Sequence, residues 1–183
     1  MKLIILDRDG VFNQDSKHYI KSPEEWIPIE GSLEAISFLN NHGYTVVVAT
    51  NQSAISKKLF TYATLNKIHQ KMSDLLELKK GKIDRVFYCP HNDEDNCSCR
   101  KPKDGLMEQI KKHYNISLKK IPSVGDSSRD LEAYYKSGAQ PILVRTGNGK
   151  MVEKNKAFPK NTLIFDNLME VAKFIVKSEE YDI

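Results

Sequence analysis

The chain has 183 residues, a length that suits one domain with a full-sized core or one domain with a small insertion. Its net charge of +4 reflects 28 basic and 24 acidic residues, and the lysine-rich stretches are dispersed. This pattern favours a solvated surface over a nucleic-acid-binding face, although it suits an anionic small-molecule substrate. Because the basic charge is dispersed, we expect no nucleic-acid partner. The longest apolar runs are strand-sized, so we expect no membrane association.

The first residues enter an apolar strand pattern directly and lack the basic segment, apolar core and cleavage site of a signal peptide. We therefore expect a soluble, cytoplasmic protein. All three cysteines lie between residues 89 and 99. In a reducing compartment, this clustering favours a metal site over a disulfide framework. No long exposed apolar helix is indicated, so we expect a monomer.

Strand and helix patterns alternate along the chain. Apolar and β-branched runs predict strands at residues 3–6, 44–49, 85–88, 121–124, 141–144 and 163–165. Helical spacing of apolar residues predicts helices at residues 31–41, 61–79, 106–114, 130–136 and 168–176. This alternation predicts parallel βαβ units. Residues 12–29 and 89–104 fit neither pattern, and long irregular loops in a compact domain are usually functional.

Polar residues follow three of the predicted strands. The first strand ends in Asp7-Arg8-Asp9-Gly10, the second in Thr50-Asn51-Gln52-Ser53, and a later one in Gly125-Asp126. Because the carboxyl ends of parallel strands lie at one edge of a sheet, we expect these groups around one crevice. Each junction alone would fit solvated acids at an ordinary strand end. Together they favour an oxygen-rich site that suits Mg²⁺.

Such a site could transfer a phosphoryl group. A hydroxyl, an amide and a lysine suit the phosphoryl oxygens, and an aspartate can attack phosphorus. Asp9, two residues after Asp7, could protonate the leaving alcohol and then activate water.

Four ordered motifs resemble those of the haloacid dehalogenase superfamily. They are Asp7-x-Asp9-Gly10, Thr50-Asn51, Lys101 and Gly125-Asp126-x-x-x-Asp130. The resemblance implies an α/β fold, with three Rossmann-like layers and a central parallel sheet, in a single domain spanning residues 1–183. It also implies a small zinc-binding loop at residues 89–104 and no large cap domain.

The same resemblance assigns roles to the motif residues. It implies that Asp7 is the nucleophile and Asp9 the general acid/base, while Thr50 and Lys101 hold the phosphoryl group. Catalytic Mg²⁺ would be bound by Asp7, the main-chain carbonyl of Asp9, and Asp126. Asp130 would support this site without contacting the metal.

The cysteines and one histidine form a second candidate metal site. Cys89, His91, Cys97 and Cys99 match a closed, tetrahedral Zn²⁺ site. Four protein ligands leave no open position, so we interpret this zinc as structural. It would order a polar loop that leads directly into Arg100 and Lys101. Incidental cysteines in a surface loop are the less favoured interpretation.

A zinc loop followed by Cys-Arg-Lys-Pro resembles the D,D-heptose 1,7-bisphosphate phosphatases and, less closely, the histidinol-phosphate phosphatases. The closer resemblance implies removal of the C7 phosphate during synthesis of the lipopolysaccharide core precursor, hence a Gram-negative source. It implies these substrate-binding residues: Asp15, Ser16, Lys17, His18, Asn51, Gln52, Ser53, Arg100 and Ser127. Ser56-Lys57-Lys58 stands where many relatives have Ala-Arg-Gly, and Ser127 stands where some have lysine.

Three alternatives remain open from the sequence. The chain could hydrolyse histidinol phosphate, or remove 3′-phosphates from nucleic-acid ends, which also requires an Asp-x-Asp crevice. A zinc-stabilised interaction module without activity is a non-enzymatic alternative, although every expected catalytic residue is present.

Overall fold

A computed structural model describes residues 1–181, so the last two residues of the expected domain lie outside the described part. Its strands are β1 (Lys2–Leu6), β2 (Tyr44–Asn51), β3 (Arg85–Cys89), β4 (Pro122–Gly125), β5 (Gln140–Val144) and β6 (Leu163–Phe165). All pair in parallel, in the order β3-β2-β1-β4-β5-β6. The strand order reverses between β1 and β4, and open α/β sheets bind ligands outside the carboxyl ends at such a point.

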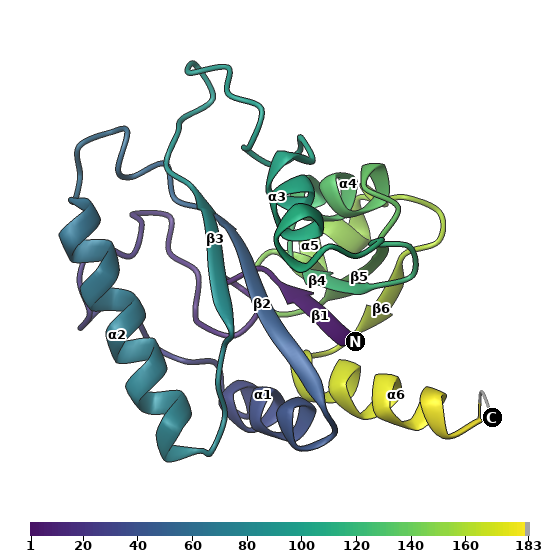
Figure 1. Ribbon diagram of the computed structural model, residues 1–183. Helices are drawn as coiled ribbons and strands as arrows, with labels where there is room; N and C mark the ends of the chain where they lie inside the picture. Colours follow the sequence, from purple (N-terminus) through teal and green to yellow (C-terminus); the bar gives the residue numbers. More distant parts are fainter. Residues whose placement is uncertain (182–183) are drawn as a thin grey trace.

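Helices cover both faces of this sheet (Figure 1). They are α1 (Ser32–Asn41), α2 (Tyr62–Leu78), α3 (Gly105–Tyr114), α4 (Ser128–Lys136), α5 (Gly149–Lys154) and α6 (Leu168–Tyr181). The sequence patterns missed α5, because its six residues are too few to show a helical repeat. They also ended α6 five residues early, at residue 176 instead of Tyr181.

Alternate residues of β1 point into two separate hydrophobic cores. Ile4 and Leu6 belong to the core on the side of α1, α2 and α6. Leu3 and Ile5 belong to the core on the side of α3, α4 and α5. The sequence of a strand that is buried on both faces is a continuous apolar run, as it is in β1. The layers of helix, sheet and helix confirm the expected three-layer α/β fold.

The segment between β1 and α1 is anchored to the core while its tip stays at the edge of the sheet. Trp26 is fully buried and its ring meets Phe12 edge-on, with 6.2 Å between ring centroids. The Ser32 hydroxyl donates to the Phe12 carbonyl over 2.7 Å. Between β1 and α1 and between β3 and α3, the described chain forms loops instead of a cap domain. No helix among residues 1–181 is long and apolar enough to cross a membrane.

Candidate active site

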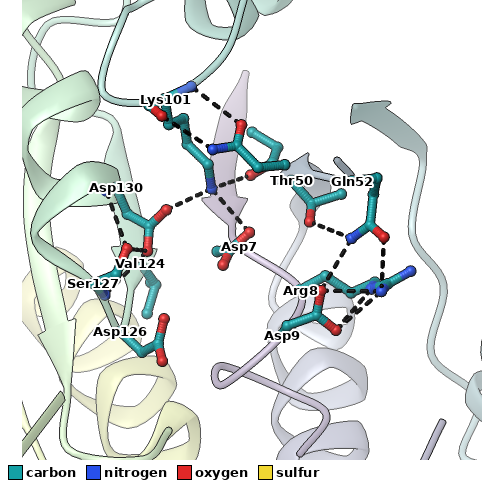
Figure 2. Close-up of polar contacts among 12 residues, drawn as sticks. Asp7, Arg8, Asp9, Thr50, Gln52, Lys101, Val124, Asp126, Ser127 and Asp130 are labelled. Atoms are coloured by element: carbon teal, nitrogen blue, oxygen red, sulfur yellow. Dashed lines mark hydrogen bonds and ion pairs between the residues drawn. The ribbon is translucent and has the colours of Figure 1, made fainter. Parts of the chain in front are cut away.

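A buried lysine links the ends of β1 and α4 (Figure 2). Lys101 Nζ lies 2.9 Å from Asp7 Oδ1 and 2.6 Å from Asp130 Oδ1. It also donates to the Ala49 carbonyl over 2.7 Å, and Lys101 is only 1% exposed. The Asp7 N–H donates to the Val124 carbonyl over 2.8 Å, which fixes the end of β1 against β4. One buried cation therefore offsets two buried carboxylates.

The backbone of Lys101 is held by the end of β2. Asn51 Nδ2 donates to the Lys101 carbonyl over 3.0 Å, and the Lys101 N–H donates to Asn51 Oδ1 over 3.1 Å. Because the side chain and the backbone of Lys101 are both held, its ammonium group has a defined position. Asn51, expected to bind substrate, thus has a second role in holding Lys101.

Three carboxylates converge at the same point. Single oxygens of Asp7, Asp126 and Asp130 all lie within 4.8 Å of one another. Both oxygens of Asp130 are engaged by protein groups, because Oδ1 contacts Lys101 and Oδ2 accepts from the Ser127 hydroxyl over 2.6 Å. Asp126 Oδ2 accepts from the Asn148 backbone N–H over 2.7 Å. Asp7 and Asp126 are therefore better placed than Asp130 to bind a cation.

The electrostatics of the three acids favour a bound cation. Burial raises the pKa of Asp7 from its ordinary value of 3.8 to about 7, although Lys101 opposes the shift. Burial, with the charges of Asp130 and Asp7, raises the pKa of Asp126 well above its ordinary value. A divalent cation would relieve this repulsion, and carboxylate oxygens are the donors that Mg²⁺ prefers.

Two glycines allow the backbone to approach Asp126. Gly10 has a φ of +79° and Gly147 a φ of +55°, both in the left-handed region. A Cβ atom on either residue would lie 2.2 Å from Asp126 Oδ2. Only glycine fits at such a distance. Gly10 of the first motif therefore leaves room for the carboxylate of Asp126, which directly follows β4.

In Figure 2, Asp9 and Thr50 lie on the other side of Asp7 from Lys101. Gln52 connects them, because its Nε2 donates to Asp9 Oδ2 and to Thr50 Oγ1, each over 3.0 Å. Arg8 and Asn13 also donate to Asp9. The sequence interpretation missed Arg8, Asn13 and Asn148. The one available signal was an arginine between two acids, whereas the contacts of the two asparagines depend on loop folding.

A cavity of about 310 Å³ collects the expected site residues. Its lining includes every expected catalytic, magnesium-binding and substrate-binding residue except His18: Asp7, Asp9, Asp15, Ser16, Lys17, Thr50, Asn51, Gln52, Ser53, Arg100, Lys101, Asp126 and Ser127. His18 is exposed, and its N–H donates to Ser16 Oγ over 3.1 Å. Lys57 and Arg129 also line the cavity, which suits an anionic ligand.

Ser127 and Arg100, like Asn51 and Gln52, are expected to bind substrate but already have hydrogen-bond partners within the protein. Ser127 is the N-cap of α4 and forms a capping box with Asp130. Arg100 Nε donates to Asp93 Oδ1 over 2.7 Å, and its Nη1 donates to the His91 carbonyl over 3.2 Å. Contacts of Ser127 and Arg100 with substrate stay predictions.

The cysteine loop brings four metal-binding atoms together. Cys99 Sγ lies 3.2 Å from Cys89 Sγ and 3.5 Å from Cys97 Sγ. His91 Nδ1 lies 3.4 Å from Cys99 Sγ and 3.6 Å from Cys89 Sγ. Around a tetrahedral zinc, with Zn–S bonds of ~2.3 Å and a Zn–N bond of ~2.0 Å, the ligand atoms would be separated by roughly 3.5 to 3.8 Å. The residues therefore fit the expected Cys₃His site.

Known proteins are similar to this chain over nearly its whole length. The family model described as polynucleotide kinase 3 phosphatase matches residues 2–170. A D-glycero-beta-D-manno-heptose-1,7-bisphosphate 7-phosphatase from Neisseria meningitidis is 48% identical over 179 residues, covering 97% of this chain and 96% of that protein. The corresponding protein of Pseudomonas putida is 48% identical over 176 residues, covering 96% of this chain and 100% of that protein.

Solved structures of related proteins have the same fold. The D,D-heptose 1,7-bisphosphate phosphatase from Bordetella bronchiseptica, complexed with magnesium and phosphate, superposes with a TM-score of 0.96 at 47% identity, covering 97% of this chain and 99% of that one. A hydrolase of the haloacid dehalogenase superfamily from Ehrlichia chaffeensis, only 14% identical, has a TM-score of 0.62 and thus shares the fold.

Fold and site together define a phosphatase, a hydrolase of phosphoric monoesters, with the fold of the haloacid dehalogenase superfamily. Within that superfamily, the chain belongs to the D-glycero-D-manno-heptose-1,7-bisphosphate phosphatase family.

Proposed function

We propose that this chain removes the C7 phosphate of D-glycero-D-manno-heptose 1,7-bisphosphate in a Mg²⁺-dependent reaction. The observation that carries the proposal is the cavity in which Asp7, Asp126 and Lys101 converge, within a chain 48% identical to phosphatases with this name. In a Gram-negative cell, the product would serve synthesis of the lipopolysaccharide core precursor. We place the enzyme in the cytoplasm, where the thiols of the cysteine loop stay reduced.

The reaction proceeds through two displacements at phosphorus. A carboxylate oxygen of Asp7 attacks phosphorus, forming an aspartyl-phosphate, while the bond to the C7 oxygen breaks. Asp9 donates a proton to that leaving oxygen. Asp9 then takes a proton from water, whose oxygen attacks phosphorus. The bond to Asp7 breaks, returning its carboxylate and releasing inorganic phosphate.

Lys101 and Thr50 would contact the phosphoryl oxygens during both steps. The Lys101 ammonium already lies 2.9 Å from Asp7 Oδ1, beside the attacking group. Mg²⁺, held by Asp7, Asp126 and the main-chain carbonyl of Asp9, would supply further positive charge at the transferring group. The Asp7 carboxylate acts ionised, and both cations favour that form over the protonated one.

Asp7→Asn tests the nucleophile assignment. The variant removes the attacking carboxylate while keeping nearly the same volume, so we expect phosphate release to become undetectable and the circular dichroism spectrum to stay unchanged. Asp74→Asn, at an exposed position of α2, is the matched control and should keep full activity. Full activity of the Asp7 variant would exclude Asp7 as the nucleophile.

A substrate panel tests the specificity. Phosphate release should be fastest with heptose 1,7-bisphosphate, and slower with fructose bisphosphate and histidinol phosphate, each compared with and without Mg²⁺. The family-model description favours one second candidate, the removal of a 3′-phosphate from DNA ends. Preferential hydrolysis of a 3′-phosphorylated oligonucleotide, with binding that weakens steeply as salt rises, would support that alternative.

The cysteine loop is the second part of the proposal. We propose that Cys89, His91, Cys97 and Cys99 bind one structural Zn²⁺. The distances among their sulfur and nitrogen atoms, 3.2 to 3.6 Å, support this assignment. The loop exposes several polar residues and buries little apolar surface beyond Cys89, so a bound ion would supply what packing does not.

A further inference from the structure

An arginine lies against the carboxylate of Asp9 (Figure 2). Arg8 is 1% exposed, and arginine is seldom so deeply buried unless it is paired. Its Nε and Nη2 donate to Asp9 Oδ1 over 3.1 and 3.0 Å, and Nη2 also donates to Oδ2 over 3.0 Å. A planar guanidinium that contacts both oxygens fixes the plane of the carboxylate.

Two amides complete the surroundings of this carboxylate. Asn13 Nδ2 donates to Asp9 Oδ1 over 2.8 Å, and Gln52 Nε2 donates to Oδ2 over 3.0 Å. Gln52 Oε1 also accepts from Arg8 Nη2 over 3.2 Å. Asp9 Oδ1 thus accepts from two nitrogens of Arg8 and one amide, and Oδ2 accepts from one nitrogen of Arg8 and one amide. The side chain of Asp9 is nevertheless 20% exposed, and it lines the cavity.

A histidine of α2 holds the other side of the guanidinium. His69 Nε2 lies 3.3 Å from Arg8 Nη1. Arginine offers only donors, so Nε2 must accept and the ring proton must be on Nδ1. Burial, followed by the charge of Arg8, lowers the pKa of His69 to about 4, which keeps the imidazole neutral near pH 7.

The helix that carries His69 is fixed by the core. Leu65, Ile68 and Met72 of α2 are buried, and the latter two belong to the core beneath β1 and β2. The His69 ring also meets the Tyr88 ring edge-on, with 6.4 Å between centroids. The position of His69 therefore follows from the packing of α2 on the sheet.

We propose that Arg8 and His69 are positioning residues that fix the orientation of Asp9 for proton transfer. The inference rests on the proposed function, because it takes Asp9 as the group that protonates the C7 oxygen and then deprotonates water. Proton transfer requires placement of the acid within about 0.5 Å. The contacts from α2 through His69 and Arg8 would provide that placement without either side chain touching the reacting atoms.

The test separates proton transfer from nucleophilic attack by changing the leaving group. His69→Leu removes the acceptor for Arg8, whereas His69→Gln offers an amide oxygen near the position of Nε2. With heptose bisphosphate, we expect His69→Leu to lower kcat and kcat/KM by about tenfold and to leave KM within twofold. 4-Nitrophenolate leaves without protonation. For 4-nitrophenyl phosphate, kcat/KM should therefore stay within twofold of that of the unmodified enzyme.

Companion variants complete the test. The kcat of His69→Gln should be within threefold of that of the unmodified enzyme. Arg8→Lys keeps the positive charge but loses the planar guanidinium that contacts both oxygens of Asp9, so it should show the same dependence on the leaving group as His69→Leu. His113→Leu, at an exposed position of α3, should match the unmodified enzyme. Equal losses of kcat/KM with both leaving groups, a change confined to KM, or an unaffected His69→Leu would overturn the proposal. Absence of phosphate release by the unmodified enzyme would instead contradict the proposed function.

Discussion

Lys101 shows how one buried charge can serve both the fold and the site. Its ammonium contacts Asp7, which follows β1, and Asp130, which lies in the first turn of α4. Burial opposes its charged form, but the charges of Asp130 and Asp7 overcome that effect and raise the pKa of Lys101. The lysine therefore stays charged at the pH at which a phosphatase works.

Removal of that charge should cost both stability and activity. Lys101→Met fills much the same volume but leaves Asp7 and Asp130 buried without a cation, so we expect a loss of about 3 kcal/mol in the free energy of unfolding. Phosphate release should also be lost. Urea denaturation followed by circular dichroism measures the first effect. Lys111→Met, at an exposed ion pair with Glu108, should change stability by less than about 1 kcal/mol.

The raised pKa values of Asp7 and Asp126 predict how pH affects the metal-free protein. Burial raises the pKa of Asp7 from 3.8 to about 7, so its contribution to stability is full below pH 3.8 and is lost as the pH rises through 7. Mg²⁺ must displace protons from these acids at low pH but not at high pH. We expect Mg²⁺ to raise Tm more at pH 8 than at pH 6, as measured by scanning calorimetry. An equal rise at both pH values would contradict this explanation.

At the scale of elements, the segment from the end of β3 to α3 carries the candidate zinc ligands together with Arg100, which is expected to contact substrate. Arg100 is tied to the loop itself, through Asp93 and the His91 carbonyl. Lys101 is tied to β2, through Asn51. Loss of zinc should therefore disturb Arg100 more than Lys101.

Cys99→Ser tests this difference. We expect the purified variant to lack stoichiometric zinc, as measured by elemental analysis, and to be cleaved faster by protease within residues 90–98. Because Arg100 would lose its fixed position while Lys101 keeps its contact with Asn51, KM should rise by about tenfold or more, and kcat should fall less. Ser73→Ala on α2 is a control that should keep zinc and activity. A fall in kcat with KM unchanged would contradict the expectation that loss of zinc disturbs Arg100 more than Lys101.

The elements differ in how far they could be predicted. The strands follow from short apolar and β-branched runs, and the long helices follow from 3.6-residue patterns. Thr61 is the N-cap of α2, as its position before the apolar stripe indicates. The motif residues could be predicted to converge because parallel strands end at one edge of the sheet. The contact between Arg8 and His69 could not, since it depends on how α2 packs, 61 residues along the chain.

At the scale of the whole molecule, the reversal of strand order explains where the site lies. β1 is central, and its two neighbours, β2 and β4, deliver Thr50 and Asp126 to either side of Asp7. Both hydrophobic cores lie below this edge, between the sheet and its helices. The site is therefore built on rigid strand ends, whereas the loops supply the groups expected to contact the sugar. The monomeric state stays a prediction.

Residues 1–181 contain no cap domain, and this bears on which step limits kcat. In enzymes that close a lid around the substrate, reopening of that lid often limits kcat, and such motion slows as solvent viscosity rises. Because the described chain forms loops where a cap domain would stand, we expect the product to leave without waiting for a lid to open. We expect kcat to be unchanged when glycerol or sucrose raises the viscosity severalfold, in stopped-flow assays corrected for osmolyte effects. A kcat that falls in proportion to viscosity would instead reveal a slow physical step before phosphate departs.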